Sequence, residues 1–201
     1  MGAATQISTS LYPKMANNVE AAFRNIHQDL LDGCKTGDQK AQFQIYKLYY
    51  KAMYNTSLRI VNDAMEAEDV MQESFLSAFE KIDSYSGTVS FGAWLKKIVI
   101  NRSLDALSRR KAIFEDIDFH VGIRDDGNED LLRKEEIDIR VEEVKEAINR
   151  LPDGYRIILS LYLLEGYDHD EIAEILSISS STSRSQLSRA KQKLIAELKR
   201  K

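Results

Sequence analysis

Cysteine, proline and histidine are scarce in this chain of 201 residues, with one, two and three copies respectively. The single cysteine, Cys34, excludes an intrachain disulfide and a metal cluster built from cysteines. His27, His120 and His169 have no cysteine, histidine or acid at a spacing that predicts a metal site, and His169 is expected at a solvated helix start. We therefore expect no metal and no cofactor.

Long apolar runs and the glycine motifs of nucleotide-binding enzymes are also missing. No stretch approaches the roughly 18 apolar residues of a membrane span, and residues 1–14 lack the apolar core of a signal peptide. There is no glycine-rich phosphate loop and no nucleophile elbow. We therefore expect a cytosolic protein without direct membrane insertion, and we expect that it is not an enzyme.

The net charge of −4 hides an uneven distribution along the chain. Residues 112–143 hold four basic and twelve acidic side chains, whereas each flanking segment has a net charge of +2. From residue 180 onward, seven lysines and arginines accompany a single acid, Glu197. Because charge asymmetry between segments carries information that the overall charge conceals, the basic C-terminal end is compatible with nucleic-acid binding.

Apolar residues recur every three or four positions through most of the chain, which is the period of a helix with one buried face. We expect helices at 23–34, 39–60, 63–82, 91–111, 141–151, 156–165, 168–176 and 180–194. The expected fold class is all-α, with two small helical domains joined by a flexible acidic linker. The expected divisions are a flexible N-terminus (1–22), an N-terminal domain (23–111), the linker (112–140) and a C-terminal domain (141–201).

The C-terminal domain contains a helix-turn-helix pattern. Asp168 followed by Glu171 predicts an N-cap with a capping box for the first helix. Ser179 can cap the second helix, on which Leu187 and Leu194 share one face while basic side chains occupy other faces. Two amphipathic helices of an ordinary bundle would show the same period, but the basic second helix favours a DNA reader.

The helix expected from Asp63 is acidic over its N-terminal half. Acids near a helix N-terminus are favoured by the helix dipole, by about 0.3–1 kcal/mol each. This effect accounts for the first turn but not for Glu73, which lies beyond it. The acidic face therefore needs a further explanation.

A polar loop at 83–90 contains one glycine and one aromatic residue, Tyr85. The helix after it carries Trp94 on its apolar side, where we expect a core residue, and basic side chains toward its end. An aromatic-containing loop beside a basic helix can hold single-stranded nucleic acid, because bases stack on the ring while cations follow the phosphates. The tyrosines of the helix at 39–60 are instead expected to pack in the core and at its rim.

Several separate stretches resemble one protein family. Residues 63–75 (DAMEAEDVMQESF) resemble the polymerase-binding segment of bacterial RNA polymerase sigma factors. Three stretches resemble the next two segments of that domain: FGAWL at 91–95, NRSLD at 101–105 and RRK at 109–111. A further set of residues resembles the C-terminal sigma domain: LP at 151–152, Arg156, EGY at 165–167, EIA at 171–173, Thr182 and LSRA at 187–190. Their order and spacing fit the extracytoplasmic-function (ECF) subfamily of the sigma-70 family, over about residues 25–111 and 140–198.

The resemblance implies a factor that binds core RNA polymerase and directs promoter-specific transcription initiation. The acidic helix would dock on a basic coiled coil of the polymerase, through Asp63, Glu66, Glu68, Asp69, Gln72, Glu73 and Phe75. The loop and the next helix would hold the minus-ten promoter element as a melted single strand, through Lys81, Tyr85, Ser86, Gly87, Lys97, Asn101, Arg102, Asp105, Arg109 and Arg110. The second helix of the helix-turn-helix would enter the duplex minus-thirty-five element, through Ser180, Thr182, Ser183, Arg184, Gln186, Arg189 and Lys193.

The resemblance also implies that the acidic linker threads the polymerase channel and that an anti-sigma factor is a further partner. Three positions depart from the family pattern, which often has glycine at Ser181, an aliphatic residue at Ser183 and a basic residue at Gln186. A free-standing helix-turn-helix regulator, acting without stable polymerase binding, is the alternative function. That alternative shares the C-terminal pattern but leaves the acidic helix and the tyrosine-containing loop unexplained.

Overall fold

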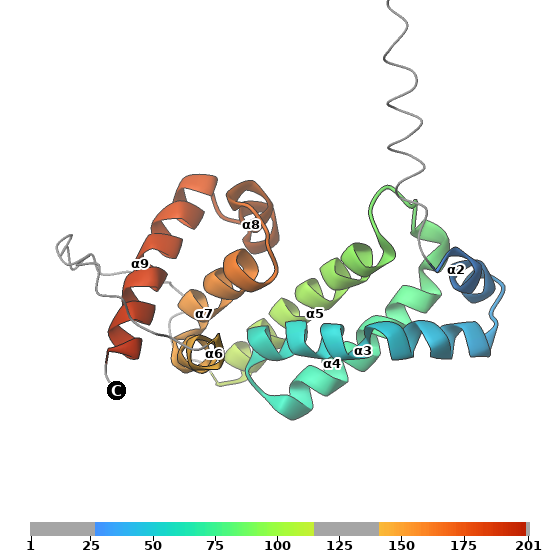
Figure 1. Ribbon diagram of the computed structural model, residues 1–201, viewed down its shortest axis with the longest axis horizontal. Coiled ribbons are helices and arrows are strands. Elements are labelled where there is room, and N and C mark those ends of the chain that lie inside the picture. Colours follow the sequence, from blue (N-terminus) through green and yellow to red (C-terminus); the bar gives the residue numbers. More distant parts are fainter. Residues whose placement is uncertain (1–26, 115–140, 200–201) are drawn as a thin grey trace, which may run out of the picture.

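The computed structural model describes residues 27–114 and 141–199, and its regular elements are all helical (Figure 1). The N-terminal body consists of α2 (Gln28–Lys35), α3 (Gln39–Val61), α4 (Ala64–Glu80), the 3₁₀ turn η1 (Ile82–Ser84) and α5 (Phe91–Phe114). The C-terminal body consists of α6 (Val141–Arg150), α7 (Asp153–Leu159), the π-helical turn η2 (Ser160–Leu164), α8 (His169–Leu176) and α9 (Ser180–Leu198). The predicted all-α fold class with two helical bodies is confirmed.

Capping residues determine where the long helices of the N-terminal body begin and end. Asp38 accepts a hydrogen bond from the Lys40 backbone N–H at 2.8 Å at the start of α3. Asn62 ends α3 in the left-handed conformation, with φ of 56°, and Asp63 then caps α4 by accepting from the Glu66 N–H at 2.9 Å. This two-residue connection lets α4 fold back against α3.

Three helices extend by three or more residues beyond their predicted bounds, and one of them, α9, continues to Leu198 instead of ending at 194. Helix α5 continues to Phe114, so residues 112–114, assigned to the linker, are helical. Helix α7 begins at Asp153 rather than at Arg156, because Pro152 leads directly into the helix and the Asp153 carboxylate pairs with the Arg156 guanidinium at 2.6 Å. The rest of the predicted linker, the predicted flexible N-terminus and residues 23–26 of the first expected helix lie outside the described residues.

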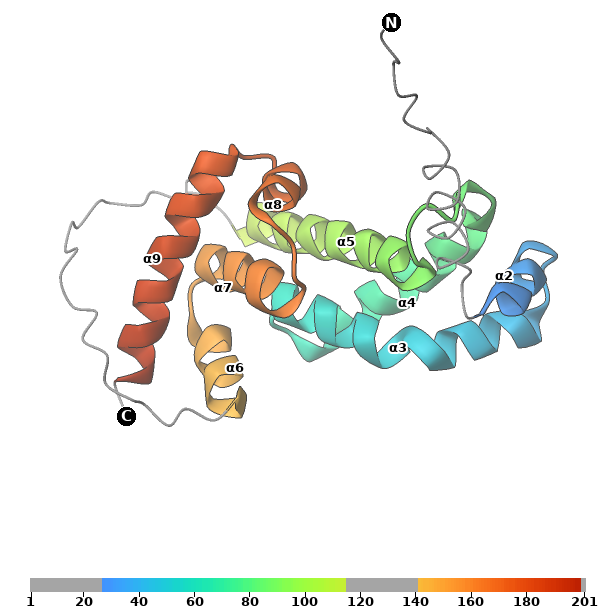
Figure 2. The same ribbon diagram turned by 45° about the horizontal axis from the view of Figure 1, so that its top comes forward.

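The N-terminal body is built from α3, α4 and α5, with α2 packed against α3 (Figures 1 and 2). Tyr46 and Tyr49 pack at the rim of its core and Tyr50 stacks on Tyr46 at 5.6 Å, as expected for these tyrosines. Trp94 is only half-buried, at the edge of the core rather than inside it. The apolar core itself includes Leu31, Ile45, Met53, Met71, Phe75, Phe91, Leu95 and Val99.

The C-terminal body packs α6, α7 and α8 against α9. Its core includes Ile148, Ile158, Leu161, Ile172, Leu187, Ala190 and Leu194. The same apolar cluster contains Ile60 of α3 and Ile100 and Leu107 of α5. Figure 2 shows α7 lying beside the end of α3 and beside α5. The two bodies therefore share one continuous apolar contact.

Candidate partner and nucleic-acid surfaces

One face of α4 carries exposed polar and acidic side chains. Glu68 and Asp69 are exposed, as predicted, and so are Gln72 and Glu73. The Gln72 amide donates a hydrogen bond to the Glu68 carboxylate at 3.2 Å. The opposite face of α4 is buried, and this stripe determines the direction in which the acids point; it consists of Ala67, Val70, Met71, Ser74, Phe75, Ser77 and Ala78.

Three of the predicted polymerase-binding residues have structural roles inside the chain. Phe75 is 3% exposed, and its ring lies 5.0 Å from that of Tyr46 and 6.0 Å from that of Phe79. The Phe75 ring therefore belongs to the buried stripe of α4, and its contact with a partner stays a prediction. Asp63 is the N-cap of α4, and Glu66 is half-buried beside α5.

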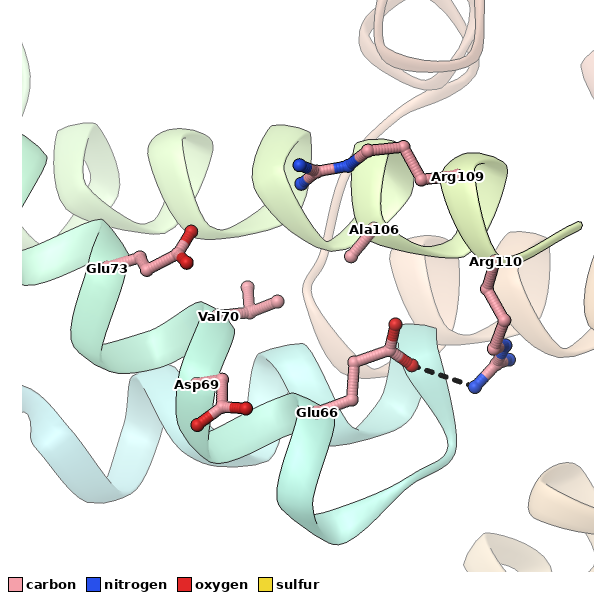
Figure 3. A pocket seen from close by; sticks show the side chains of 7 residues that line it. All are labelled: Glu66, Asp69, Val70, Glu73, Ala106, Arg109 and Arg110. Atoms are coloured by element: carbon pink, nitrogen blue, oxygen red, sulfur yellow. Dashed lines mark hydrogen bonds and ion pairs between the residues drawn. The ribbon is translucent and has the colours of Figure 1, made fainter. Parts of the chain in front are cut away.

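Ion pairs join the acidic face of α4 to the basic face of α5. The Glu66 carboxylate lies 2.8 Å from Arg110, and the Glu73 carboxylate lies 2.9 Å from Arg102. Figure 3 shows the Glu66–Arg110 pair closing one end of a hollow of about 350 Å³ between the two helices. Arg110 also donates to the Val61 carbonyl at 3.1 Å, so it is anchored to the N-terminal body while its side chain remains 35% exposed.

A second hollow, of about 720 Å³, lies between the C-terminal part of α4 and α5. Its polar wall brings together five of the predicted minus-ten residues from two helices, namely Lys81, Asn101, Arg102, Asp105 and Arg109. Lys81 closes α4, whereas the others follow one another along successive turns of α5. The structure thus places three cations, one amide and one carboxylate around a single groove. Such a set can contact both phosphates and base edges.

Tyr85 holds the two ends of the loop at 85–90 together, and its side chain points into the protein. Tyr85 is 7% exposed, and its hydroxyl donates to the Val89 carbonyl at 2.6 Å. Its ring lies 5.6 Å from that of Phe91 and 5.3 Å from that of Trp94. The Tyr85 ring is therefore part of the core in this structure, and its contact with a base stays a prediction. Ser86 is exposed at the loop tip, next to Gly87 with a φ of 75°.

The helix-turn-helix has the predicted caps. Asp168 accepts from the backbone N–H groups of Asp170 and Glu171 at 2.8 Å, and the Glu171 carboxylate accepts from the Asp168 N–H at 2.8 Å. This is a complete capping box at the start of α8. Ser179 caps α9 by accepting from the Thr182 N–H at 3.0 Å. The turn between the helices passes through Ser177, in the left-handed conformation with a φ of 54°.

Ser183 and His169 differ from their predicted positions. Ser183 has no exposed surface, because it lies on the same stripe of α9 as Leu187, and its hydroxyl lies 3.0 Å from His169 Nδ1. His169 also stacks on Tyr162 with 5.2 Å between ring centroids, so it belongs to the packing of α8 against α9 instead of to a solvated helix start. The Ser183 side chain therefore points into the protein, whereas its assignment to DNA stays a prediction.

The outer face of α9 carries Arg184 and Lys193, both exposed, while Gln186 and Arg189 are half-buried. The Ser180 hydroxyl donates to the Asp170 carboxylate at 2.5 Å, and the Thr182 hydroxyl lies 2.7 Å from that of Ser179. These two residues therefore take part in the connection between α8 and α9. Sequence reasoning missed three exposed serines that follow the helical period on this face: Ser181, Ser185 and Ser188.

A buried carboxylate joins the two bodies. The Glu165 side chain is 3% exposed and accepts hydrogen bonds from the Thr56 hydroxyl and the Arg59 Nε, each at 3.1 Å, and from a second Arg59 nitrogen, Nη2. Lys96 Nζ lies 2.9 Å from the other carboxylate oxygen. The π-helical turn η2 positions Glu165, whose backbone N–H donates to the Ser160 carbonyl at 3.0 Å.

The charges around Glu165 determine its protonation state and that of Tyr167, which lines the same hollow. Burial by itself raises the pKa of the Glu165 carboxyl, but hydrogen bonds from Lys96 and Arg59 and their positive charges outweigh burial and hold that pKa below its ordinary value. Burial, followed by the charges of Glu165 and Glu171, raises the pKa of Tyr167 to about 12. At neutral pH the site therefore contains an ionised carboxylate and a neutral phenol.

Two further contacts tie the bodies together. Arg156 is 2% exposed and donates to the carbonyls of Arg59 at 3.2 Å and Ile60 at 2.8 Å, at the end of α3. Lys97, a predicted minus-ten residue, lies 2.8 Å from the Glu174 carboxylate of α8 on the surface. Nothing in the spacing of the sequence indicated these pairs, because their members are separated by 77 residues or more.

None of the helices in the described ranges combines the length and apolar character that a bilayer crossing requires. Two family models match the chain, Sigma-70 region 2 over residues 45–113 and Sigma-70, region 4 over residues 141–194. The RNA polymerase sigma-H factor of Pseudomonas aeruginosa is 30% identical over 175 residues, which are 82% of this chain and 90% of that protein. The ECF RNA polymerase sigma factor SigW of Bacillus subtilis is 28% identical over 178 residues, 82% of this chain and 92% of that protein.

Solved structures share the fold. The sigma factor RpoE of Bartonella quintana, in complex with the anti-sigma factor NepR, matches with a TM-score of 0.55 and 24% identity, over 78% of this chain and 95% of that chain. CnrH, in complex with the cytosolic domain of CnrY, matches with a TM-score of 0.52 and 22% identity, over 85% and 95%. At these identities the structural matches support the fold alone.

Sequence similarity carries the assignment further than fold. The ECF RNA polymerase sigma-E factor of Haemophilus influenzae is 31% identical over 176 residues, 82% of this chain and 91% of that protein. The two matched regions fall in the two bodies, in the order that the sequence predicted. The chain belongs to the ECF subfamily of the sigma-70 family of RNA polymerase sigma factors, proteins that are not enzymes and that direct promoter-specific transcription initiation by RNA polymerase.

Proposed function

We propose that the exposed acidic face of α4 binds a basic surface of core RNA polymerase. Glu68, Asp69, Gln72 and Glu73 present their polar groups to solvent on a helix anchored by a buried stripe. A rigid acidic face of this kind suits electrostatic complementarity, which sets the register and rate of association. Asp63, Glu66 and Phe75 support the face by capping, pairing and packing.

The minus-ten element is proposed to bind as a melted single strand in the groove between α4 and α5. The observation that carries this assignment is the gathering of Lys81, Asn101, Arg102, Asp105 and Arg109 around one hollow. Their cations suit phosphates, and the amide and carboxylate suit base edges. This surface is extended by Ser86, Gly87 and Lys97. An extruded base would be held at the loop at 85–90, whose buried residue is Tyr85.

Helix α9 is proposed to enter the major groove of the minus-thirty-five element. Arg184 is exposed and suits a bidentate contact with guanine. Ser185 and Ser188, on the same outer face, have hydroxyl groups that can contact either bases or phosphates. Arg189 and Lys193 are assigned to phosphates, and Gln186 to a contact at the edge of the interface, since it is half-buried.

The N-terminal domain (23–111) and the C-terminal domain (141–201) are proposed to act as the two promoter-reading units. We infer that the chain works in the cytoplasm, where core RNA polymerase meets the genome. An anti-sigma protein is proposed as a further partner, since the similar RpoE structure is a complex of a sigma factor with an anti-sigma factor, and the similar CnrH structure is a complex with the cytosolic domain of CnrY. Co-purification of such a protein with the tagged chain, in a form that competes with core polymerase, is the expected outcome.

The test of the function is reconstitution with core RNA polymerase from the chain's own source, followed by transcription of a genomic promoter library. We expect tight binding and initiation at a defined set of promoters. Glu68→Lys combined with Asp69→Lys should lower polymerase affinity by at least about tenfold, because opposite charges become like charges. Asp29→Lys, on the exposed start of α2, is the matched control and should bind normally. Normal binding by the double variant would overturn the docking assignment.

A further inference from the structure

A preorganised anion-binding site on the N-terminal body is formed by Arg59, Lys96 and Thr56. Their donors converge on one carboxylate, that of Glu165, which belongs to the C-terminal body. The Thr56 residue is 1% exposed, and the side chains of Arg59 and Lys96 are 27% and 29% exposed with Glu165 in place. The site is therefore assembled entirely by α3 and α5 and is filled by a group from elsewhere in the chain.

The packed arrangement of the bodies must open for the proposed function. Promoter elements centred about 25 base pairs apart are separated by about 85 Å, at about 3.4 Å per base pair. In this structure Lys97 of α5 and Glu174 of α8 are in direct contact, so the proposed minus-ten surface touches the helix-turn-helix. When the C-terminal body leaves to reach its own element, Glu165 leaves with it.

Opening leaves two cations and a hydroxyl directed at the same vacated position. Water can then satisfy the exposed donors, but two positive charges held close together attract another anion to the position that the carboxylate has left. In a promoter complex, the abundant anion is the DNA backbone phosphate, whose several oxygens match a guanidinium and an ammonium together. A carboxylate and a phosphate offer the same kind of acceptor to these donors.

The anion site is continuous with the surface that we assign to the minus-ten strand. A groove of about 420 Å³ runs along the junction and is lined by Ser90, at the end of the loop, as well as by Lys96 and Glu165. Lys96 and Asn101 belong to the same helix but lie on different faces of it, because residues five positions apart point in different directions. A strand that leaves the loop along the groove lined by Ser90 therefore passes close to Lys96.

We propose that Arg59 and Lys96 bind a backbone phosphate of the promoter DNA in the open complex, and that Glu165 occupies this phosphate site while the two bodies are packed together. Glu174 forms an exposed ion pair with Lys97 on the surface. The C-terminal body thus screens the upstream end of the minus-ten surface with two carboxylates. The inference rests on the proposed function and adds residues that the family resemblance did not assign.

The experiment measures binding of reconstituted holoenzyme to a promoter fragment with a premelted minus-ten segment, at about 50 to 200 mM salt. Lys96→Met and Arg59→Met remove one charge each with little change in volume. Each should lower the slope of log affinity against log salt by about 0.7–0.9, so that the loss of affinity over this range becomes about threefold smaller. Lys51→Met, an exposed lysine of α3, is the matched control and should leave the slope unchanged.

A neutral methylphosphonate, placed at one backbone position at a time, identifies the phosphate. We expect one position at which the neutral linkage weakens binding by the unaltered holoenzyme but has no further effect on the Lys96→Met holoenzyme. Glu165→Gln should leave the holoenzyme slope unchanged and should raise the affinity of the free chain for the same DNA severalfold. Circular dichroism and polymerase affinity matching the unaltered chain show that each variant is folded.

An unchanged slope for both Lys96→Met and Arg59→Met would overturn the phosphate site, and would mean that these residues only hold Glu165. A methylphosphonate effect that persists fully in Lys96→Met would also overturn it. These outcomes are distinct from failure of the proposed function, in which the unaltered chain neither binds core polymerase nor initiates at any promoter. If Arg59→Met does not fold, Lys96→Met and the methylphosphonate series decide the question alone.

Discussion

The two bodies bury different kinds of polar group. In the described part of the N-terminal body, the buried polar residues carry hydroxyls: Thr56, Ser57, Ser74, Ser77 and Ser103. The C-terminal body buries hydroxyls too, but it also buries the guanidinium of Arg156 and the carboxylate of Glu165. Charged groups are far more expensive to remove from water than hydroxyls, so the two bodies have different requirements for stability.

The partners of these groups explain the difference. The Ser103 hydroxyl donates to the Val99 carbonyl at 2.7 Å and lies 3.0 Å from the Ser57 hydroxyl, both within the N-terminal body. Arg156 and Glu165, in contrast, bind groups of α3 and α5 across the junction. The N-terminal body therefore satisfies most of its buried polar groups by itself, whereas the Glu165 carboxylate is satisfied by docking. Arg156 divides its donors between the junction and two groups of its own body, the Asp153 carboxylate and the Leu151 carbonyl. Buried charge here contributes both to the attachment of the bodies and to the start of α7.

The largest effect should come from Arg156→Met. Removing the guanidinium leaves the Arg59 and Ile60 carbonyls without their donor, and we expect a loss of about 3 kcal/mol in the free energy of unfolding. The loss should appear in urea unfolding followed by circular dichroism, which reports all helices. Fluorescence of Trp94, the single tryptophan, reports the N-terminal body and should shift less. Equal shifts in both signals would show that the two bodies unfold as one unit and do not differ in their requirements for stability.

Glu165→Gln should have the next largest effect, about 2 kcal/mol at neutral pH, since its partners remain partly solvated. The lowered pKa of Glu165 means that its carboxylate stabilises docking above the ordinary value of 4.5 and that this stabilisation is lost as pH falls below it. Between about pH 5 and pH 3, the free energy of unfolding should therefore fall more steeply with decreasing pH in the unaltered chain than in the variant. Parallel pH profiles would argue against a charged Glu165 at the junction.

Ser103→Ala should have the smallest effect of the three, about 1 kcal/mol, because a neutral hydrogen bond contributes about that much. The hydroxyl lies inside the N-terminal body, so the change should appear equally in Trp94 fluorescence and in circular dichroism. A loss as large as that of Arg156→Met would remove the distinction between buried hydroxyls and buried charges. Binding to core polymerase should not change, since Ser103 has no exposed surface.

The exposed functional faces were predictable to different degrees from the sequence. On α4 the exposure of Glu68 and Asp69 was predicted correctly, because the opposite face is a regular buried stripe, but Phe75 was assigned to the polymerase-binding set although it belongs to that stripe. On α9 the buried stripe includes a polar residue, Ser183, which the prediction assigned to DNA. Its hydrogen bond with His169 explains why a serine is accommodated where relatives often have an aliphatic side chain.

Helix type, the cap residues Asp63, Asp168 and Ser179, and the order of the two bodies were determined by the sequence itself, because these features depend on neighbours within one or two turns. The tertiary structure alone decided which side chains meet. Glu165 pairs with Arg59 across 106 residues, and Glu66 pairs with Arg110 across 44. Helical periodicity shows which face of a helix is polar, but not which other helix that face will contact. That pairing is set by the packing of α7 and α4 against α3 and α5, and the same packing decides which charges are available to polymerase and DNA.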